Sequence, residues 1–246
     1  MNDKKVLLII MDGWGLGQIE KSDAIHHAKT PFVQSLYSSY PNTTLITCGE
    51  AVGLPSGQMG NSEVGHLNLG AGRIVYQELQ RIHVAIREGV FQKNPTLHEA
   101  LNYVKKATKT LHLIGLVSDG GVHSHTDHLK ALLDVCKAEQ VTQVCVHAFT
   151  DGRDTDPSSG LGYLESLQEH LSKTVGSLAT ITGRYYAMDR DKRWDRIKFA
   201  YDALVHGTGE STADMLGAVK QSYQNGITDE FIKPIINTQV PHGNIP

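Results

Sequence analysis

The stretch TLHLIGLVSDGGVHSHTDHLKALLDVCKAEQVTQVCVHAFT, residues 110–150, contains a complete strand–helix–strand unit. Residues 110–118 and 142–150 are short apolar runs, which is the pattern of strands buried inside a parallel sheet. Between them, residues 127–139 repeat apolar side chains at helical spacing. A third apolar run, residues 177–183, begins after about 33 more residues, the length of a βα unit. The pattern predicts an α/β fold with a parallel sheet.

The sequence before this unit lacks the regular alternation of strand and helix patterns, and the change lies near Tyr76. Apolar runs at residues 5–11 and 43–49 predict two further strands, and the segment between them predicts a helix with proline at its first position. A glycine-rich segment follows. Helical patterns are also present at residues 74–88, 95–107, 160–173, 194–206 and 211–222. We therefore place a domain boundary between residues 1–76 and residues 77–246.

Composition and charge exclude several classes of protein. The formal net charge is −3 and the pI is about 6.5, which gives no broad attraction to nucleic acid or to an anionic membrane. No apolar stretch approaches the roughly 20 residues that span a bilayer, and Asp12 interrupts the apolar start of the chain before any signal-peptide cleavage site. The three cysteines form no C-x-x-C pair, so we expect buried thiols and a cytoplasmic protein.

Charged side chains and histidines follow each of the three strands of the alternating region. Because the carboxyl ends of parallel strands meet at one edge of a sheet, we expect these side chains to form one rim. The rim candidates are His123, His125, Arg153, Asp154, Arg184, Arg190 and Arg193. Arginine binds phosphate and carboxylate groups through two parallel hydrogen bonds, so the rim is typical of a pocket for a small polyanion. For any one arginine, the alternative is an ion pair with a nearby aspartate: Asp151, Asp156, Asp189, Asp191 or Asp195.

The first of these loops also has the spacing H-x-H-x-D-H, formed by His123, His125, Asp127 and His128. Metallo-hydrolases of the metallo-β-lactamase type hold zinc with this spacing, although short metal motifs also occur without a metal. The arginines of the neighbouring loops favour the polyanion pocket, with His123 as one of its residues. His125 and His128 are then local hydrogen-bonding or solvent-facing side chains. Zinc binding that uses His123 and His125 is the alternative.

Ser62 lies in the glycine-rich segment GQMGNSEVGHLNLGAGR, directly before a helical pattern. The N–H groups at a helix N-terminus favour anions, so a phosphoryl group on Ser62 would be stabilised there. A serine hydroxyl needs a base or a metal ion to act as a nucleophile. The alternative is that Ser62 only caps the helix.

Asp12 directly follows the predicted strand of residues 5–11, a position where a carboxylate can bind a hard metal ion. Because Ser62 lies beyond the next predicted strand, two adjacent strands would bring both residues to one metal ion. The alternative is an Asx turn with Gly13.

Five segments occur in a fixed order along the chain: MDGWG, MGNSEVGHLNLGAGR, SDGGVHSH, TDGRDTDP and GRYYAMDRDKRWDR. They closely resemble the 2,3-bisphosphoglycerate-independent phosphoglycerate mutases of the alkaline phosphatase superfamily, and the resemblance covers essentially the whole chain. It implies interconversion of 3-phosphoglycerate and 2-phosphoglycerate through a phosphoserine, with two manganese ions and without 2,3-bisphosphoglycerate. It also implies part of an alkaline-phosphatase-like parallel sheet in residues 1–76 and an inserted α/β transferase domain in residues 77–246. We expect a monomer that binds this small-molecule substrate and neither nucleic acid nor membrane.

The resemblance also assigns roles to single residues. Ser62 matches the nucleophile, and Asp12 matches a ligand of the metal ion that Ser62 shares. Asp154 matches the acid and base that acts on the glycerate hydroxyls. The residues that match those holding the phosphoglycerate are His123, Arg153, Asp154, Arg184 and Arg190. Closure of two domains over the substrate would keep water away from the phosphoserine.

The chain ends at Pro246, at roughly half the length of the family. The later Asp and His residues that supply most metal ligands in the family, and further substrate-binding Arg and Lys residues, are not in this sequence. Residues 237–246 predict neither a terminal helix nor a final strand. We therefore expect the N-terminal part of a mutase, with an incomplete second domain and with its activity in a longer protein. The alternatives are a non-catalytic phosphoglycerate-binding module and a related phosphatase or phosphopentomutase of the superfamily.

Overall fold

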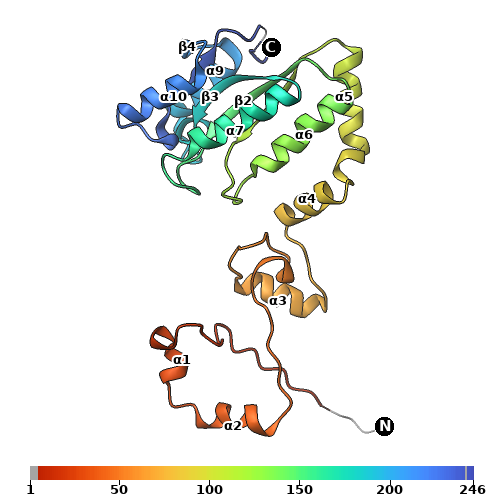
Figure 1. Ribbon diagram of the computed structural model, residues 1–246, viewed down its shortest axis with the longest axis vertical. Helices are drawn as coiled ribbons and strands as arrows, with labels where there is room; N and C mark the ends of the chain where they lie inside the picture. Colours follow the sequence, from red (N-terminus) through yellow and green to blue (C-terminus); the bar gives the residue numbers. More distant parts are fainter. Residues whose placement is uncertain (1–4, 242) are drawn as a thin grey trace. The chain divides into compact units, whose positions relative to one another are not determined.

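The computed structural model describes residues 5–241 and 243–246 (Figure 1). The chain divides into two compact units, Met1–Tyr76 and Gln77–Pro246. The identity of these units as parts of a phosphatase-like domain and a transferase domain stays a prediction. None of the helices in the described part of the chain combines the length and the apolar character that crossing a bilayer requires.

A five-stranded sheet forms the centre of the second unit (Figure 1). Its strands are β1 (Leu111–Leu116), β2 (Val144–Thr150), β3 (Ser177–Gly183), β4 (Glu210–Thr212) and β5 (Ile235–Asn237). The strand order is β1-β2-β3-β5-β4; β1, β2 and β3 are parallel, β5 is antiparallel to β3, and β4 is parallel to β5. The predicted α/β class and the three predicted strands of this unit are confirmed. The sheet is mostly rather than wholly parallel, because β5 returns in the opposite direction.

The two shortest strands, β4 and β5, are the part of the sheet that the sequence does not predict. Each contains three residues, which is too short a run to show an alternation of apolar and polar side chains. β4 occupies the start of the helix predicted at residues 211–222, so the helix there begins only at Met215. β5 includes Asn237, where the sequence predicts no strand.

Helices cover the sheet, and all of those described in this unit except α8 correspond to predicted helices. They are α4 (Glu78–Arg87), α5 (Pro95–Lys106), α6 (Thr126–Ala138), α7 (Gly160–Lys173), α8 (Arg184–Ala187), α9 (Trp194–His206) and α10 (Met215–Gln224), with the 3-10 turns η3 (Phe91–Lys93) and η4 (Asp229–Phe231). α6 and α7 lie side by side (Figure 1), α10 packs against α7, and α4 packs against α6. The predicted helix at residues 74–88 is shorter in the structure, because its first four residues precede α4.

The core of the second unit lies between the sheet and these helices. Leu133 of α6, Leu164 of α7 and Ile181 of β3 are fully buried there. Cys136 and Cys145 are buried as expected, and burial raises the pKa of the Cys136 thiol to about 11, which keeps it protonated and unreactive. The third cysteine, Cys48 of the first unit, is exposed, so the expectation of a buried thiol is wrong for this residue.

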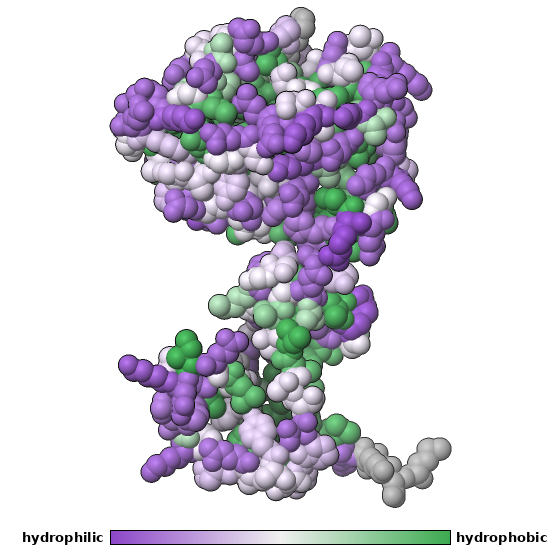
Figure 2. Space-filling view, viewed as in Figure 1, coloured by the Kyte–Doolittle hydropathy of each residue, from purple (hydrophilic) through white to green (hydrophobic). Residues whose placement is uncertain are grey.

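The first unit contains helices but, within residues 5–76, no strand. Its elements are η1 (Glu20–Ser22), α1 (Ala24–His27), α2 (Pro31–Ser39), η2 (Gly49–Val52) and α3 (Ser62–Ala71). The strands predicted at residues 5–11 and 43–49 do not form. Their apolar side chains are exposed, as in Val6 at 92 % and Leu45 at 76 %, and Figure 2 shows apolar atoms at the surface of this unit. A strand requires a ladder of partners for its N–H and C=O groups, and neither run forms one within residues 5–76; the run at residues 43–49 has isolated bonds such as the one from the Gly49 N–H to the Gln58 carbonyl oxygen at 3.0 Å.

Candidate functional site

Three polar side chains follow the carboxyl ends of β1, β2 and β3 in register. The pairings between neighbouring strands, continued beyond the sheet, bring Ser118, Asp151 and Arg184 side by side. The Ser118 hydroxyl donates to Oδ2 of Asp151 at 2.6 Å, and Nη1 of Arg184 donates to Oδ1 of Asp151 at 2.6 Å. Asp151 is 1 % exposed and Arg184 is 7 % exposed. The parallel strands therefore build a buried polar chain beneath the loops of the rim.

Asp151 organises the loop that follows β2. Its Oδ1 also accepts the backbone N–H groups of Arg153 at 3.2 Å and Asp154 at 3.0 Å. Burial raises the pKa of the Asp151 carboxyl, but the hydrogen bonds from Ser118, the Asp154 backbone and Arg184 outweigh burial, so the net shift is downward. From the sequence, Asp151 is expected only as an ion-pair partner for an arginine. Its position directly after a strand was the available signal that it could hold two predicted site residues in place.

Asp154 joins the three loops of the rim. Its Oδ2 accepts a hydrogen bond from Nη1 of Arg184 at 2.7 Å and lies 3.6 Å from Nε2 of His123. The structure thus brings together three predicted site residues that come from three different strand ends. A partly buried carboxylate between a guanidinium group and an imidazole can exchange a proton with a bound hydroxyl group.

The arginines of the rim have different surroundings. Arg184 is buried and paired with two carboxylates, which is the alternative that the sequence left open for any one arginine. The Arg153 side chain is 54 % exposed, with Nε 3.6 Å from Oε1 of Glu230. Arg193 forms an ion pair at 3.4 Å with a neighbouring aspartate. Arg190 is exposed and makes no hydrogen bond or ion pair with any residue that the structure describes. Arg190 therefore has the guanidinium group most available to an anion, and Arg153 and Arg193 are each half exposed with one ion pair.

In the first unit, Ser62 and Asp12 lie together although 50 positions separate them in the sequence. Oγ of Ser62 donates to Oδ2 of Asp12 at 2.6 Å. The cap of α3 is Asn61, whose side chain accepts the N–H of Val64 at 2.9 Å, and Ser62 is the first residue of the helix. The alternative that Ser62 itself is the helix cap is therefore wrong. A carboxylate at this distance can orient the hydroxyl and accept its proton.

Gly60 fixes the turn that leads into Ser62. A Cβ atom at this position would lie 1.7 Å from the carbonyl oxygen of Thr47, which is far inside van der Waals contact. Only glycine allows the two backbone segments to approach this closely. This contact gives a physical reason for one of the glycines in the glycine-rich segment.

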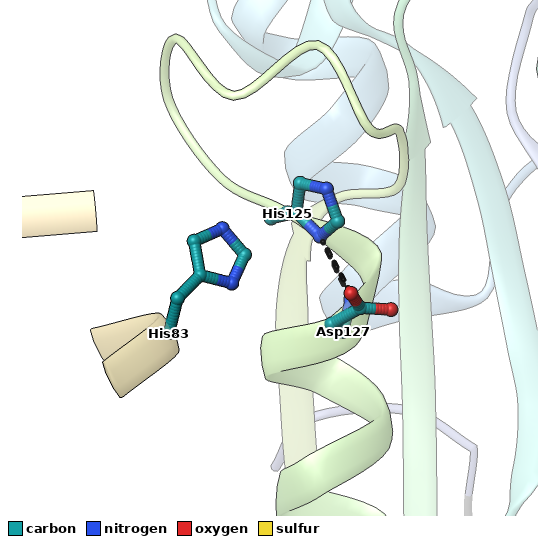
Figure 3. Close-up of side chains that lie close together, drawn as sticks. All are labelled: His83, His125 and Asp127. Atoms are coloured by element: carbon teal, nitrogen blue, oxygen red, sulfur yellow. Dashed lines mark hydrogen bonds and ion pairs between the residues drawn. The ribbon is translucent and has the colours of Figure 1, made fainter. Parts of the chain in front are cut away.

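A second group of side chains lies at the start of α6 and includes a residue from another helix. His83 of α4 is close to His125 and Asp127 (Figure 3), and one possible ligand atom from each lies within 4.8 Å of the others. The His83 ring lies 4.7 Å from the His125 ring and 4.7 Å from the His128 ring, measured between centroids. Burial, and then the neighbouring His83 and His125, lower the pKa of His128 to about 4. His83 is not predicted from the sequence, because no linear motif connects α4 with α6.

The four residues of the H-x-H-x-D-H spacing do not converge on one point. His123 faces Asp154 across 3.6 Å, and it belongs to no cluster of metal-ligand side chains among the described residues. His125 caps α6, with its Nδ1 accepting the N–H of Asp127 at 3.2 Å. The local hydrogen-bonding role expected for His125 is therefore confirmed, and the structure gives no support to a zinc site that uses both His123 and His125.

Comparison with known proteins gives consistent matches. A family model described as the BPG-independent PGAM N-terminus matches residues 82–245. The 2,3-bisphosphoglycerate-independent phosphoglycerate mutase of Bacteroides fragilis is 54 % identical over 237 residues, covering 96 % of this chain and 47 % of the relative. The enzyme of the same name from Myxococcus xanthus is 58 % identical over 233 residues, covering 94 % and 45 %. The chain spans about half the length of the curated relatives that it matches.

A solved structure matches the fold as well. It is a crystal structure of Leishmania mexicana phosphoglycerate mutase at low cobalt concentration, with a TM-score of 0.70 and 32 % sequence identity. The match covers 96 % of this chain and 46 % of that chain. The α/β architecture derived from the sequence is therefore also that of a solved protein.

Proposed function

Because the chain belongs to the BPG-independent PGAM N-terminus family, we propose that it is the phosphoryl-accepting and phosphoglycerate-binding half of a 2,3-bisphosphoglycerate-independent phosphoglycerate mutase. The reaction would be the interconversion of 3-phosphoglycerate and 2-phosphoglycerate, a step of glycolysis. A monomeric state and a cytoplasmic location stay predictions from the sequence.

The observation that carries the proposal is the 2.6 Å hydrogen bond from Ser62 to Asp12. In the proposed reaction, Oγ of Ser62 forms a bond to phosphorus while the bond from phosphorus to the glycerate oxygen breaks. Asp12 holds the hydroxyl in place and accepts its proton. The phosphoryl group then lies at the N-terminus of α3, where backbone N–H groups and the helix dipole favour an anion. The reverse transfer to the other glycerate oxygen completes the isomerisation.

The metal dependence that the resemblance implies has a partial counterpart in the same pair. Asp12 and Ser62 offer oxygen ligands, the donor type that Mn²⁺ prefers, and they would supply two ligands of a larger set. A bound cation would favour the ionised form of the Ser62 hydroxyl and offset the charge of the phosphoryl group. We therefore include Asp12 and Ser62 as proposed metal ligands.

The rim of the second unit supports the binding of a phosphoglycerate. Arg153 and Arg190 have exposed guanidinium groups, which we propose to bind the carboxylate and phosphate of the substrate. His123 and Asp154 lie close enough to act on one ligand, and we propose that Asp154 exchanges the proton with the glycerate hydroxyls. Arg184 would contribute mainly by orienting Asp154, since its guanidinium group donates hydrogen bonds to the carboxylates of Asp151 and Asp154.

A second candidate is a phosphoglycerate-binding module without turnover. The observation in its favour is that Asp12 and Ser62 are exposed and supply few ligands for a tight metal site. Both candidates require the rim to bind phosphoglycerate, and they differ only in whether Ser62 accepts the phosphoryl group.

Calorimetric titration of the 246-residue chain with 3-phosphoglycerate tests the shared requirement. We expect saturable binding that Arg153→Met and Arg190→Met each weaken at least about tenfold, which corresponds to about 1.4 kcal/mol. Arg81→Met is the matched control, because Arg81 is an exposed arginine of the same unit whose ion pair is with Glu78 on its own helix. Equal affinity in the wild type and in both rim variants, or no binding by the folded wild type, would overturn the proposal.

A further inference from the structure

The histidine cluster beside α6 has the composition of a transition-metal site. His83 comes from α4, whereas His125 and Asp127 come from the cap and first turn of α6 (Figure 3). Each offers one possible ligand atom, and these atoms lie within 4.8 Å of one another. His128 adds a third imidazole, whose ring lies 4.7 Å from that of His83. Residues far apart in the sequence thus concentrate nitrogen and carboxylate donors at one place.

We propose that His83, His125 and Asp127 bind a zinc ion in the second unit. Two imidazoles and one carboxylate are a common zinc donor set, and the imidazoles disfavour Mg²⁺ and Ca²⁺, which prefer oxygen ligands. This donor set is distinct from Asp12 and Ser62, which offer only oxygen. The inference is independent of the proposed mutase function.

The present geometry requires only small side-chain movements to hold the ion. With zinc–ligand bonds of about 2.0–2.1 Å, the ligand atoms of a tetrahedral site lie roughly 3.3 Å apart. The possible ligand atoms here lie within 4.8 Å of one another, so they must approach by at most about an ångström or two. Asp127 has an exposed side chain, and its carboxylate already lies 3.5 Å from Nδ1 of His125. The hydrogen bond from the Asp127 N–H to the His125 ring is 3.2 Å long, which is at the weak end of the range.

A second observation points to a polar ligand at this position. Nε2 of His128 is buried and has no hydrogen-bond partner among the residues that the structure describes. Buried polar atoms are normally satisfied, so an orphaned nitrogen on an imidazole whose ring lies 4.7 Å from that of His83 is unusual. A metal ion bound here would carry water ligands, and such a water could form a hydrogen bond with Nε2 of His128.

The proposed ion would connect α4 to the start of α6. These two helices already pack together, and the loop that enters α6 carries His123, which faces Asp154 of the rim. A ligand from each helix would limit the movement of α4 against that loop. The ion would therefore have a structural role, which can be detected without any assay of activity.

Zinc affinity and stoichiometry test this proposal directly. The 246-residue chain, stripped of metal, is titrated with Zn²⁺ against a chromophoric chelator, and bound zinc is then counted by mass spectrometry after desalting. We expect His83→Gln to lose one equivalent of zinc, or to bind that equivalent at least about tenfold more weakly, a change of about 1.4 kcal/mol. Asp127→Asn, a change at an exposed side chain, is expected to weaken the same equivalent and gives a second test if His83→Gln does not fold.

Two further variants separate this site from its rivals. His123→Gln should retain the full equivalent, because His123 faces Asp154 and not the cluster. His98→Gln is the matched control, since His98 is another partly exposed helical histidine of the same unit that is ion-paired with Glu139. Loss of zinc in His123→Gln with retention in His83→Gln would overturn the proposal in favour of the linear H-x-H-x-D-H motif. Identical zinc binding by the wild type and His83→Gln would overturn it outright.

Discussion

Replacement of Arg184 by methionine tests whether this residue holds the rim loops together. Methionine retains much of the length of the side chain but removes its charge. Nη1 of Arg184 bonds to Asp151 at 2.6 Å and to Asp154 at 2.7 Å, and the Arg184 side chain is only 8 % exposed. Removal of one partner from a buried ion pair costs about 3–5 kcal/mol, because the remaining charge is left without compensation.

The expected loss lies at the lower end of that range. Asp151 keeps the hydrogen bonds from Ser118 and from two backbone N–H groups. We therefore expect the free energy of unfolding to fall by about 3 kcal/mol near neutral pH. The pKa of Asp151 in the folded chain lies below its ordinary value, so its stabilising contribution is present above the unfolded pKa and is lost as pH falls through the folded pKa. In Arg184→Met, the Asp151 carboxylate accepts a proton more readily than in the wild type. The difference in the free energy of unfolding between the two proteins should therefore shrink as the pH falls towards about 4.

Urea unfolding followed by far-ultraviolet circular dichroism measures this change. The signal reports chiefly on the second unit, which contains all the strands in the described part of the chain and most of its helices. Arg193→Met is the matched control, because Arg193 is half exposed and its ion pair at 3.4 Å lies on the surface. Its effect should stay within about 0.5 kcal/mol. A loss below about 1 kcal/mol for Arg184→Met would show that the guanidinium group is not needed to hold the two carboxylates in place. The guanidinium group would then be available to a substrate, as the family resemblance implies.

Three further predictions concern a buried histidine, a helix cap and a glycine turn. Burial, followed by His112, lowers the pKa of His147 to about 4, so the unfolded chain binds more protons between about pH 4 and about pH 6.5. His147 alone should contribute a loss of roughly 2 kcal/mol in the free energy of unfolding from pH 7 to about pH 5, in addition to the contribution of His128, so the total loss in urea unfolding should be smaller by that amount in His147→Gln. Asn61→Ala should destabilise α3 by about 1 kcal/mol, because Asn61 caps that helix. The helical circular dichroism signal should then be lost on milder heating, and an unchanged melting profile would contradict this role. Gly60→Ala should make residues 47–62 more susceptible to limited proteolysis, because the added Cβ meets the Thr47 carbonyl oxygen. Equal cleavage rates in the wild type and the variant would argue against this close approach.

The three longer strands and most helices of the second unit follow from the sequence, because each satisfies its own pattern and finds its partner nearby. β1, β2 and β3 are consecutive in both the chain and the sheet, so local apolar runs were sufficient to predict them. The same type of run at residues 5–11 does not form a strand. Its pattern specifies a buried environment, but the pairing that creates a strand depends on other segments, which a local pattern does not contain.

The candidate sites also contain some features that local sequence patterns predict and others that depend on packing between distant segments. The strand-end rule predicted that Arg184 and Asp154 would meet, and an ion pair of an arginine with Asp151 was an open alternative. The rule did not predict that one buried arginine would pair with both carboxylates. The pairing of Ser62 with Asp12 followed from motifs near two predicted strand ends, although those strands do not form. His83 joins its cluster only through the packing of α4 on α6, and packing between helices leaves no signature at a fixed spacing in the sequence.

The most direct test of the central claim is the fate of the phosphoryl group. The chain is incubated with 3-phosphoglycerate and Mn²⁺, quenched in acid, and the peptide that contains Ser62 is examined by mass spectrometry. We expect a phosphoryl group on Ser62 that is absent from Ser62→Ala and retained in Ser56→Ala, a change at another serine of the same glycine-rich region. A folded chain that binds 3-phosphoglycerate but never carries phosphate on Ser62 would contradict the account and leave a binding module in its place.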